Sequence, residues 1–420
     1  MVDTSNWDWE VGEKQIDMTG WPDNFQWVEE PYASPDGESV AAIVNVDEGE
    51  FNVCTNGRTW DNSFDKIWHL RFSPDGRLFA LVSEMGEWTV AVDGQAWESK
   101  FGYVWNPLVS EDGHSIAVAV QQDMRYAMAV EGKAWENDFA NMTYFVLSPD
   151  GRQTAAAVQV LEADSGEVHK FQKGTFTAAL DGRPWDAVFV NVWNLAISQD
   201  GRHLAAEVRL NLYDYTIAVD GRTWEQTYGC VWAPCFNPST GAVAAPVRTS
   251  GKWVMAADGQ IIWPGKFIQL WQQRFNADGS SLAAIVAPTY GRWTVAVDGT
   301  PWNTTFGQMV TDLTFSPGGT HLAALGKDRD HWQVVVDGNA WNTVCDRAWP
   351  PVFAPEGRTV AAKVEKSGKY TIAVNDRLWQ VACDAVWDPT FSPDGSRLLI
   401  RTVENGIYKR HIVPVSTITG

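Results

Sequence analysis

Two short phrases alternate along the chain and divide it into similar units. Runs of alternating residues, such as Trp88, Val90 and Val92, lead into the phrase VDG, and a second phrase of the SPDG type stands between successive runs. In SPDG, proline presets one turn dihedral and glycine accepts a left-handed conformation, whereas Asp-Gly supplies the two positive φ angles of a type I′ hairpin. Both phrases therefore predict tight turns between antiparallel strands.

The SPDG-type turn recurs at a spacing of about 40 residues, which is the period of a four-stranded propeller blade. Its ten glycines are Gly37, Gly76, Gly113, Gly151, Gly201, Gly241, Gly279, Gly319, Gly357 and Gly395. One unit predicts strands near 104–109, 115–120, 126–130 and 133–136, and we name these four positions A to D. Strands this short are not stable alone, so each sheet is expected to pack against neighbouring sheets. The expected fold is all-β: a single closed β-propeller of about ten four-stranded blades over residues 1–420. A smaller ring with irregular units is the alternative.

The two ends of the chain each supply part of a unit. Residues 16–25 match the end of strand C and strand D, and 390–415 supply A, B and C with no D after them. We therefore expect residues 16–25 to pair with the C-terminal strands, which would close the propeller and remove open sheet edges. The one insertion, residues 160–176, falls in the B–C connection of the fourth full unit.

Strand A carries proline in several units, at Pro107, Pro234, Pro351 and Pro389. Proline has no backbone N–H to donate to a neighbouring strand, so within sheets it is found chiefly at an edge. Strand A is therefore predicted to be an edge strand, and to face the channel of the propeller.

A tryptophan recurs at strand D in every unit, and a second bulky or sulfur-containing residue follows four positions later. The tryptophans are Trp21, Trp60, Trp97, Trp135, Trp185, Trp224, Trp263, Trp302, Trp341 and Trp379, and the followers run from Phe25 and Phe64 to Cys345 and Cys383. A large ring at a fixed place suits packing between adjacent twisted sheets, because each ring buries roughly 150–250 Å². We expect these residues to wedge neighbouring blades together.

Seven further tryptophans occupy one slot of strand A: Trp68, Trp105, Trp193, Trp232, Trp271, Trp349 and Trp387. Strand alternation places this slot near the edge that carries the B–C and D–A connections and the insertion. One interpretation is packing within the blades. The other is a partner-binding face, since tryptophan is enriched at interface hot spots. The insertion residues Glu162, Asp164, Glu167, His169 and Lys170 would belong to this face.

The net charge of −20 disfavours nucleic acid and anionic lipid as partners, because both bind through phosphate that Lys and Arg neutralise. Residues 1–50 contain thirteen acids and one lysine, which suits a solvated surface or the steering of a basic partner. No basic start precedes an apolar run, and no apolar run reaches 18 residues, so we expect a soluble, cytoplasmic chain without membrane insertion.

Motifs for chemistry are missing from the sequence. The five cysteines form no CxxC pair, the seven histidines are scattered, and no nucleotide, zinc-hydrolase or nucleophile-elbow motif occurs. We therefore expect no catalytic residues, no metal site and no cofactor of its own.

The turn phrases resemble WD40-like β-propeller repeats over nearly the whole chain. The VDGxxW units, such as Asp93, Gly94 and Trp97, and the WxP strands, such as Trp349 and Pro351, further resemble the tryptophan-rich TmcD subunits of the Tmc transmembrane redox complexes of sulfate-reducing bacteria. This resemblance implies a non-catalytic cytoplasmic scaffold, peripheral to the inner membrane. Its partners would be an iron–sulfur subunit related to heterodisulfide reductase, a membrane cytochrome b and a multihaem cytochrome c.

Two other functions remain open from the sequence alone. The propeller could stand alone and bind a small ligand through the strand-A tryptophans, or it could be an enzyme. The repeats offer no titratable groups that depart from the pattern together, which disfavours the enzyme.

Overall fold

The computed structural model describes residues 3–161, 168–263 and 265–420. Within these residues the strands form ten antiparallel sheets in the order A–B–C–D, which we number as blades 1 to 10 along the chain. The fold is an all-β β-propeller of ten blades, as the turn spacing predicts. Strand A is an edge strand in every blade, as its prolines predict.

The chain divides into two compact units. The first comprises residues 60–266 with Glu48–Asn52, and it holds blades 2 to 6. Its strands are β7 (Lys66–Phe72), β8 (Leu78–Glu84), β9 (Glu87–Val92) and β10 (Gln95–Ala96); β11 (Tyr103–Val109), β12 (Ile116–Gln122), β13 (Arg125–Val130) and β14 (Lys133–Ala134); β15 (Met142–Leu147), β16 (Thr154–Gln159), β17 (Phe176–Leu180) and β18 (Arg183–Pro184); β19 (Asn191–Ile197), β20 (Leu204–Arg209), β21 (Tyr215–Val219) and β22 (Arg222–Thr223); and β23 (Cys235–Phe236), β24 (Val243–Thr249), β25 (Lys252–Ala257) and β26 (Gln260–Ile261). Helix α2 (Val168–Lys173) lies in the B–C connection of blade 4.

The second unit comprises Asp3–Asp47, Val53–Thr59 and Phe267–Gly420, and it holds blades 7 to 10 and most of blade 1. Its strands are β2 (Trp27–Val28), β3 (Tyr32–Ala33), β4 (Val40–Asp47), β5 (Glu50–Thr55) and β6 (Arg58–Thr59); β27 (Gln269–Phe275), β28 (Leu282–Thr289), β29 (Arg292–Val297) and β30 (Thr300–Pro301); β31 (Met309–Phe315), β32 (Leu322–Asp328), β33 (His331–Val336) and β34 (Asn339–Ala340); β35 (Arg347–Ala348), β36 (Val352–Phe353), β37 (Val360–Lys366), β38 (Lys369–Val374) and β39 (Arg377–Leu378); and β40 (Ala385–Val386), β41 (Thr390–Phe391), β42 (Arg397–Glu404), β43 (Ile407–Pro414) and β1 (Gly12–Asp17). Helices α1 (Trp21–Asn24) and α3 (Val415–Thr419) complete it. That residues 1–420 act as a single domain stays a prediction.

Both turn phrases adopt the predicted geometry. At Ser148–Gly151 the Gly151 N–H donates to the Ser148 carbonyl at 2.9 Å, and the Ser148 hydroxyl donates to Asp150 Oδ1 at 2.6 Å. In the VDG hairpin of blade 2, Asp93 and Gly94 have φ angles of 48° and 82°, as a type I′ turn requires. The aspartate has a second role, because Asp93 Oδ1 accepts the Leu78 N–H at 2.9 Å at the start of strand B. The C–D turn is thereby fastened to its own blade.

The tryptophan of strand D packs on the VDG glycine of the next blade. A Cβ atom placed on Gly182 of blade 4 would lie 2.9 Å from Trp135 Cβ of blade 3, and one on Gly94 would lie 3.0 Å from Trp60 Cγ. Trp135 also donates through Nε1 to Thr154 Oγ1 of blade 4 at 2.8 Å. The ring that ends one repeat thus contacts the turn of the next, which confirms the predicted packing between blades.

The residues four positions after these tryptophans are buried as well. Phe64, Phe101, Phe139, Phe189, Phe267, Phe306, Cys345 and Cys383 are each at most 8% exposed. Burial raises the pKa of the Cys345 and Cys383 thiols to about 11, so both behave as compact apolar groups.

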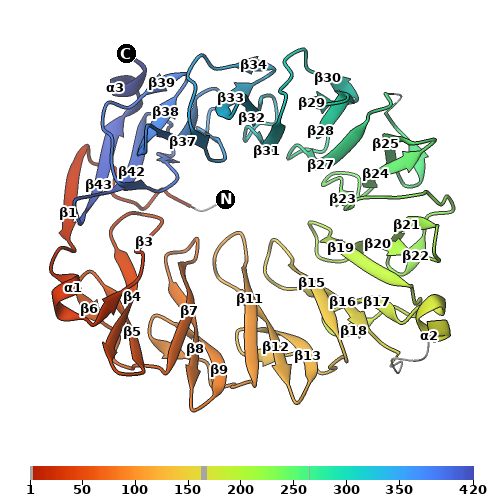
Figure 1. Cartoon of the computed structure of the whole chain (residues 1–420), viewed down its shortest axis with the longest axis horizontal. Coiled ribbons are helices and arrows are strands. Elements are labelled where there is room, and N and C mark those ends of the chain that lie inside the picture. Colours follow the sequence, from red (N-terminus) through yellow and green to blue (C-terminus); the bar gives the residue numbers. More distant parts are fainter. Residues whose placement is uncertain (1–2, 162–167, 264) are drawn as a thin grey trace. The chain divides into compact units, whose positions relative to one another are not determined.

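The N-terminal strand that completes blade 10 is β1, which pairs antiparallel with β43 from Gly12↔Ile412 to Asp17↔Ile407 (Figure 1). It overlaps the predicted segment 16–25 only at its end. Trp21–Asn24 form the helical turn α1 instead of a strand, because Pro22 favours the first turn of a helix. Trp21 is nevertheless 5% exposed and packs in an apolar cluster with Met18 and Tyr408.

Buried cations of blade 10 hold the SPDG turn of blade 1. The Arg401 guanidinium donates to the carbonyls of Ser34 and Asp388, each at 2.7 Å, and Arg410 Nε donates to the Asp36 carbonyl at 2.9 Å. Arg410 also donates to the Asp8 carbonyl, ahead of β1. These backbone carbonyls, together with the Glu38 carboxylate 3.1 Å from Arg410 Nε, compensate cations that would be costly to bury alone.

Candidate interaction surface

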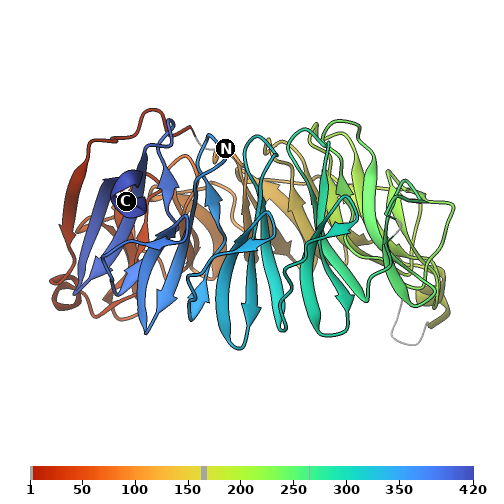
Figure 2. The ribbon, with the colours of Figure 1, turned by 90° about the horizontal axis from the view of Figure 1, so that it is seen from above.

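In each blade the B–C hairpin and the A–B hairpin lie at opposite edges of the sheet (Figure 2). We call the end of the strands that carries the B–C hairpins the B–C edge; it is distinct from the edge strands A and D. The seven strand-A tryptophans stand near this edge, and each contacts an aromatic side chain of strand C in its own blade. The pairs and their ring-centroid distances are Trp68–Trp88 (4.6 Å), Trp105–Tyr126 (6.0 Å), Trp193–Tyr215 (6.1 Å), Trp232–Trp253 (5.3 Å), Trp271–Trp293 (4.6 Å), Trp349–Tyr370 (5.7 Å) and Trp387–Tyr408 (5.8 Å).

These pairs serve packing, yet part of the slot faces outward. Trp68 and Trp232 are 44% and 38% exposed, and the other five are intermediate. Packing alone does not explain such exposure, because a ring that only filled a core would be covered. The strand-A slot therefore combines a packed face with an accessible one.

In blades 2 to 4 the aromatic side chains continue from one strand A to the next. Tyr103 lies 6.4 Å from Trp68 and 5.8 Å from Trp105, and Trp105 lies 5.9 Å from Phe145 between ring centroids. Tyr103 is 39% exposed. Beside this row, Tyr144 is 43% exposed and has a φ angle of 55°, which is unfavourable for a bulky side chain. Tyr103 and Tyr144 could not be predicted from the tryptophan pattern, because they lie outside it.

The tips of the B–C hairpins carry strongly exposed apolar side chains. Met85, Met124 and Tyr213, in blades 2, 3 and 5, are 90%, 73% and 77% exposed, and Leu212 beside Tyr213 is 57% exposed. In blade 7, Tyr290 is 92% exposed. In contrast, no large apolar side chain in the described part of the chain is exposed at an A–B turn. The B–C edge of blades 2 to 5 is thus the apolar edge of the first unit.

Acidic side chains flank these tips. Glu84 and Glu87 bracket the tip at Met85, Asp123 precedes Met124, and Asp214 follows Tyr213. Lys100 partly neutralises Glu84 through an ion pair of 2.8 Å. An apolar partner surface bordered by basic residues would complement this edge.

The insertion belongs to the same edge of blade 4. His169 is exposed and Lys170 follows it within α2, whereas Glu162, Asp164 and Glu167 lie outside the described residues. The structure therefore places the described part of the insertion at the predicted edge.

In strand B, the residue opposite the strand-A tryptophan is apolar in most blades. Three blades carry a charged residue there: Glu207, Lys363 and Arg401. Lys363 Nζ lies 4.4 Å from the Trp349 ring centroid, which is a cation–π distance.

Glu207 is 6% exposed and accepts one hydrogen bond from Asn194 Nδ2 at 2.8 Å. Burial raises the pKa of the Glu207 carboxyl to about 7.

Glu207 is expected to make stability fall as the pH rises from about 4.5 to about 7. In this range the carboxyl is protonated in the folded chain but ionised in the unfolded chain, so folding binds a proton and loses free energy with rising pH. Glu207→Gln should remove this dependence and raise the free energy of unfolding at pH 8 by roughly 2–3 kcal/mol. Urea unfolding of both proteins at pH 5 and pH 8 measures the effect. An equal loss of stability in the variant would contradict the assignment.

The described residues contain no group of three or more His, Cys, Asp or Glu side chains placed to hold a metal ion. Within the same residues, no helix is long and apolar enough to cross a membrane.

No protein-family model matches the sequence, and no curated protein matches it. Solved structures do match. A eukaryotic initiation factor is 14% identical, with 80% of this chain and 96% of that chain covered and a TM-score of 0.48. The β-propeller domain of Cps50 (Swd1) from Myceliophteria thermophila is 13% identical, with 66% and 98% covered and a TM-score of 0.32. The Dos1 propeller is 12% identical, with 91% and 92% covered and a TM-score of 0.36.

The chain has a WD40-like β-propeller fold. Four-stranded blades and SPDG-type turns carry this conclusion. Identities of 12% to 14% show the fold alone.

Proposed function

We propose that the protein is a non-catalytic scaffold that binds a protein partner on the B–C edge of blades 2 to 5. The observation that carries the proposal is the exposure of Met85, Met124, Leu212 and Tyr213 at the B–C tips of blades 2, 3 and 5. Exposed methionine and tyrosine side chains adapt to and anchor protein partners. β-Propellers commonly serve as scaffolds for protein interaction.

The partner, in this proposal, is a subunit of a Tmc-type membrane redox complex that links periplasmic cytochrome c to cytoplasmic acceptors. The VDGxxW and WxP phrases support it through their resemblance to the tryptophan-rich subunits of such complexes. The chain would stay in the cytoplasm, peripheral to the inner membrane. The haem and iron–sulfur groups would belong to the partners: a cytochrome b, a multihaem cytochrome c and a subunit related to heterodisulfide reductase.

Purification from the native source tests this assignment. A tagged chain isolated with mild detergent is expected to carry haem absorbance and iron in fixed proportion. A colourless chain without partners, from membranes that contain the haem proteins, would refute the redox assignment.

With the double variant Met124→Ser and Tyr213→Ser, we expect the amount of partner that co-purifies to fall at least tenfold. Thermal unfolding should stay unchanged, because both side chains are mostly exposed. Tyr290→Ser in blade 7 is the matched control, since Tyr290 is also mostly exposed, at a B–C tip of the second unit. Full retention of the partner by the double variant would show that binding uses another surface.

A further inference from the structure

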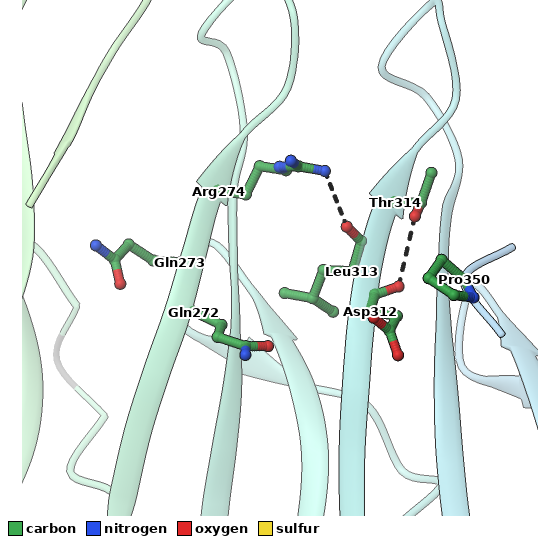
Figure 3. Close-up of a pocket in the computed structure, with 7 residues that line it drawn as sticks. All are labelled: Gln272, Gln273, Arg274, Asp312, Leu313, Thr314 and Pro350. Carbon is green, nitrogen blue, oxygen red and sulfur yellow. Dashed lines mark hydrogen bonds between the residues drawn. The ribbon is translucent and has the colours of Figure 1, made fainter. Parts of the chain in front are cut away.

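A polar hollow of about 460 Å³ lies between the A strands of neighbouring blades in the second unit. Gln272, Gln273 and Arg274 of β27 line one side, Asp312, Leu313 and Thr314 of β31 line the other, and Pro350 of blade 9 completes it (Figure 3). Arg274 reaches across the hollow, and its Nη1 donates to the Leu313 carbonyl at 3.1 Å. Gln272 extends from β27 towards Asp312 on β31 (Figure 3).

The lining departs from the repeat. The residue two positions after the strand-A slot is Leu70, Pro107, Phe145, Leu195, Pro234, Leu313, Pro351 and Pro389 in other blades, but Gln273 in blade 7. The next residue is apolar in five of the other blades, at Leu108, Val146, Ala196, Cys235 and Val352, whereas blade 7 has Arg274. Gln273 therefore replaces an apolar packing residue here, whereas the positions on either side of it are also polar in some other blades, for example at Asn194 and Arg71. Departures of this kind mark sites where function competes with stability.

The backbone of the hollow is also strained. Gln272 and Asp312 have φ angles of 50° and 61°, a left-handed conformation that costs free energy for residues other than glycine. The strand-A bulge that follows Trp271 produces this conformation at Gln272, and the equivalent bulge produces it at Asp312. The two bulges bring both side chains to the hollow.

Opposite charges face this hollow without pairing with each other. Arg274 donates to the Leu313 carbonyl, and Asp312 accepts from the neighbouring Thr311 hydroxyl at 2.6 Å. Among the described residues, no ion pair joins Arg274 to Asp312. A guanidinium in this state retains N–H groups for a carboxylate, and a carboxylate retains lone pairs for an ammonium group.

We propose that this hollow binds a small zwitterion of amino-acid size. Its carboxylate would pair with Arg274 and its ammonium group with Asp312, and the Gln272 carboxamide can serve either end. A phosphorylated ligand fits poorly, because Asp312 would repel it. A metal ion fits poorly too, because Asp312 is the one carboxylate among the lining residues.

Calorimetric titration of the full chain with each of the twenty proteinogenic L-amino acids tests the proposal. At least one is expected to bind, and its decarboxylated amine and deaminated acid are expected to bind at least tenfold more weakly, since each lacks one charge pair. Glucose serves as a neutral polyol of similar size and is expected not to bind. Failure of every amino acid to bind at millimolar concentration would overturn the proposal, as would tighter binding of glucose.

Substitutions in the lining test whether the ligand binds in this hollow. Arg274→Gln and Asp312→Asn are each expected to weaken binding at least tenfold while thermal unfolding stays unchanged. Arg71→Gln is the matched control, because Arg71 occupies the Arg274 slot in blade 2. Equal binding by all three variants would overturn the assignment. The result does not depend on the partner-binding edge, which lies in other blades.

Discussion

Removal of residues 1–17 is expected to destabilise the chain by on the order of 5 kcal/mol and to cause aggregation, because several backbone hydrogen bonds of about 1 kcal/mol each are lost. The deletion exposes the edge of β43 along its pairing with β1. It also removes the Asp8 and Trp9 carbonyls, which accept bonds from Arg410 and Arg397. Arg410 is 2% exposed, so it would lose part of its compensation inside the core. Thermal unfolding followed by circular dichroism and light scattering measures both effects.

Removal of residues 1–6 is the control, because it keeps Asp8, Trp9 and β1. This shorter deletion is expected to leave the unfolding midpoint near that of the full chain. A peptide of residues 7–18, added in trans, should restore part of the stability to the longer deletion. Equal stability of both deletions would show that β1 does not hold blade 10.

Trp135→Ala is expected to lower the free energy of unfolding by about 3 kcal/mol, in line with other large-to-small aromatic substitutions. The substitution removes the contact with Gly182, the edge-to-face contact with Phe139 at 6.2 Å and the bond to Thr154. Urea unfolding provides the measurement. Trp68→Ala should cost clearly less, because Trp68 is 44% exposed.

A double-mutant cycle isolates the contact between the two blades. Gly182→Ala alone should be strongly destabilising, since the φ angle is 74° and the new Cβ would lie 2.9 Å from Trp135. The same change should cost less in the Trp135→Ala background, where the clash is relieved. Additive effects would show that the ring and the turn do not meet.

The fold follows from signals that act locally. Pro and Gly at fixed turn positions determine the SPDG turns, and Asp-Gly determines the C–D hairpins, so the number of blades can be read from the chain. The N-terminal strand could not be placed by the same means. The Trp21 and Phe25 spacing imitates strand D, but Pro22 begins a helical turn and the pairing strand lies earlier, at Gly12–Asp17.

The candidate surface was only partly predictable. The strand-A tryptophans are visible as a repeated slot, but their pairing with strand C depends on a register that the sequence does not specify. Met85, Met124 and Tyr213 occupy variable hairpin tips and carry no repeat signal. Gln272 and Asp312 adopt a left-handed backbone conformation because of strand-A bulges. No proline or glycine at these positions indicates the bulges in the sequence. Glu207 and Gln273 could have been found by comparing each unit with its neighbours, since both stand where most other units have an apolar residue.

The contact between Trp135 and Gly182 spans two consecutive copies of the repeat, and so do Trp60 with Gly94 and Trp302 with Gly338. Blade 3 carries both parts of such an interface, because Gly132 contacts Trp97 of blade 2 and Trp135 contacts Gly182 of blade 4. Duplication of a whole copy within the gene would insert an element that already fits both neighbours. Such a chain can lengthen by tandem duplication without any new interface having to evolve, which offers a simple origin for an array of ten.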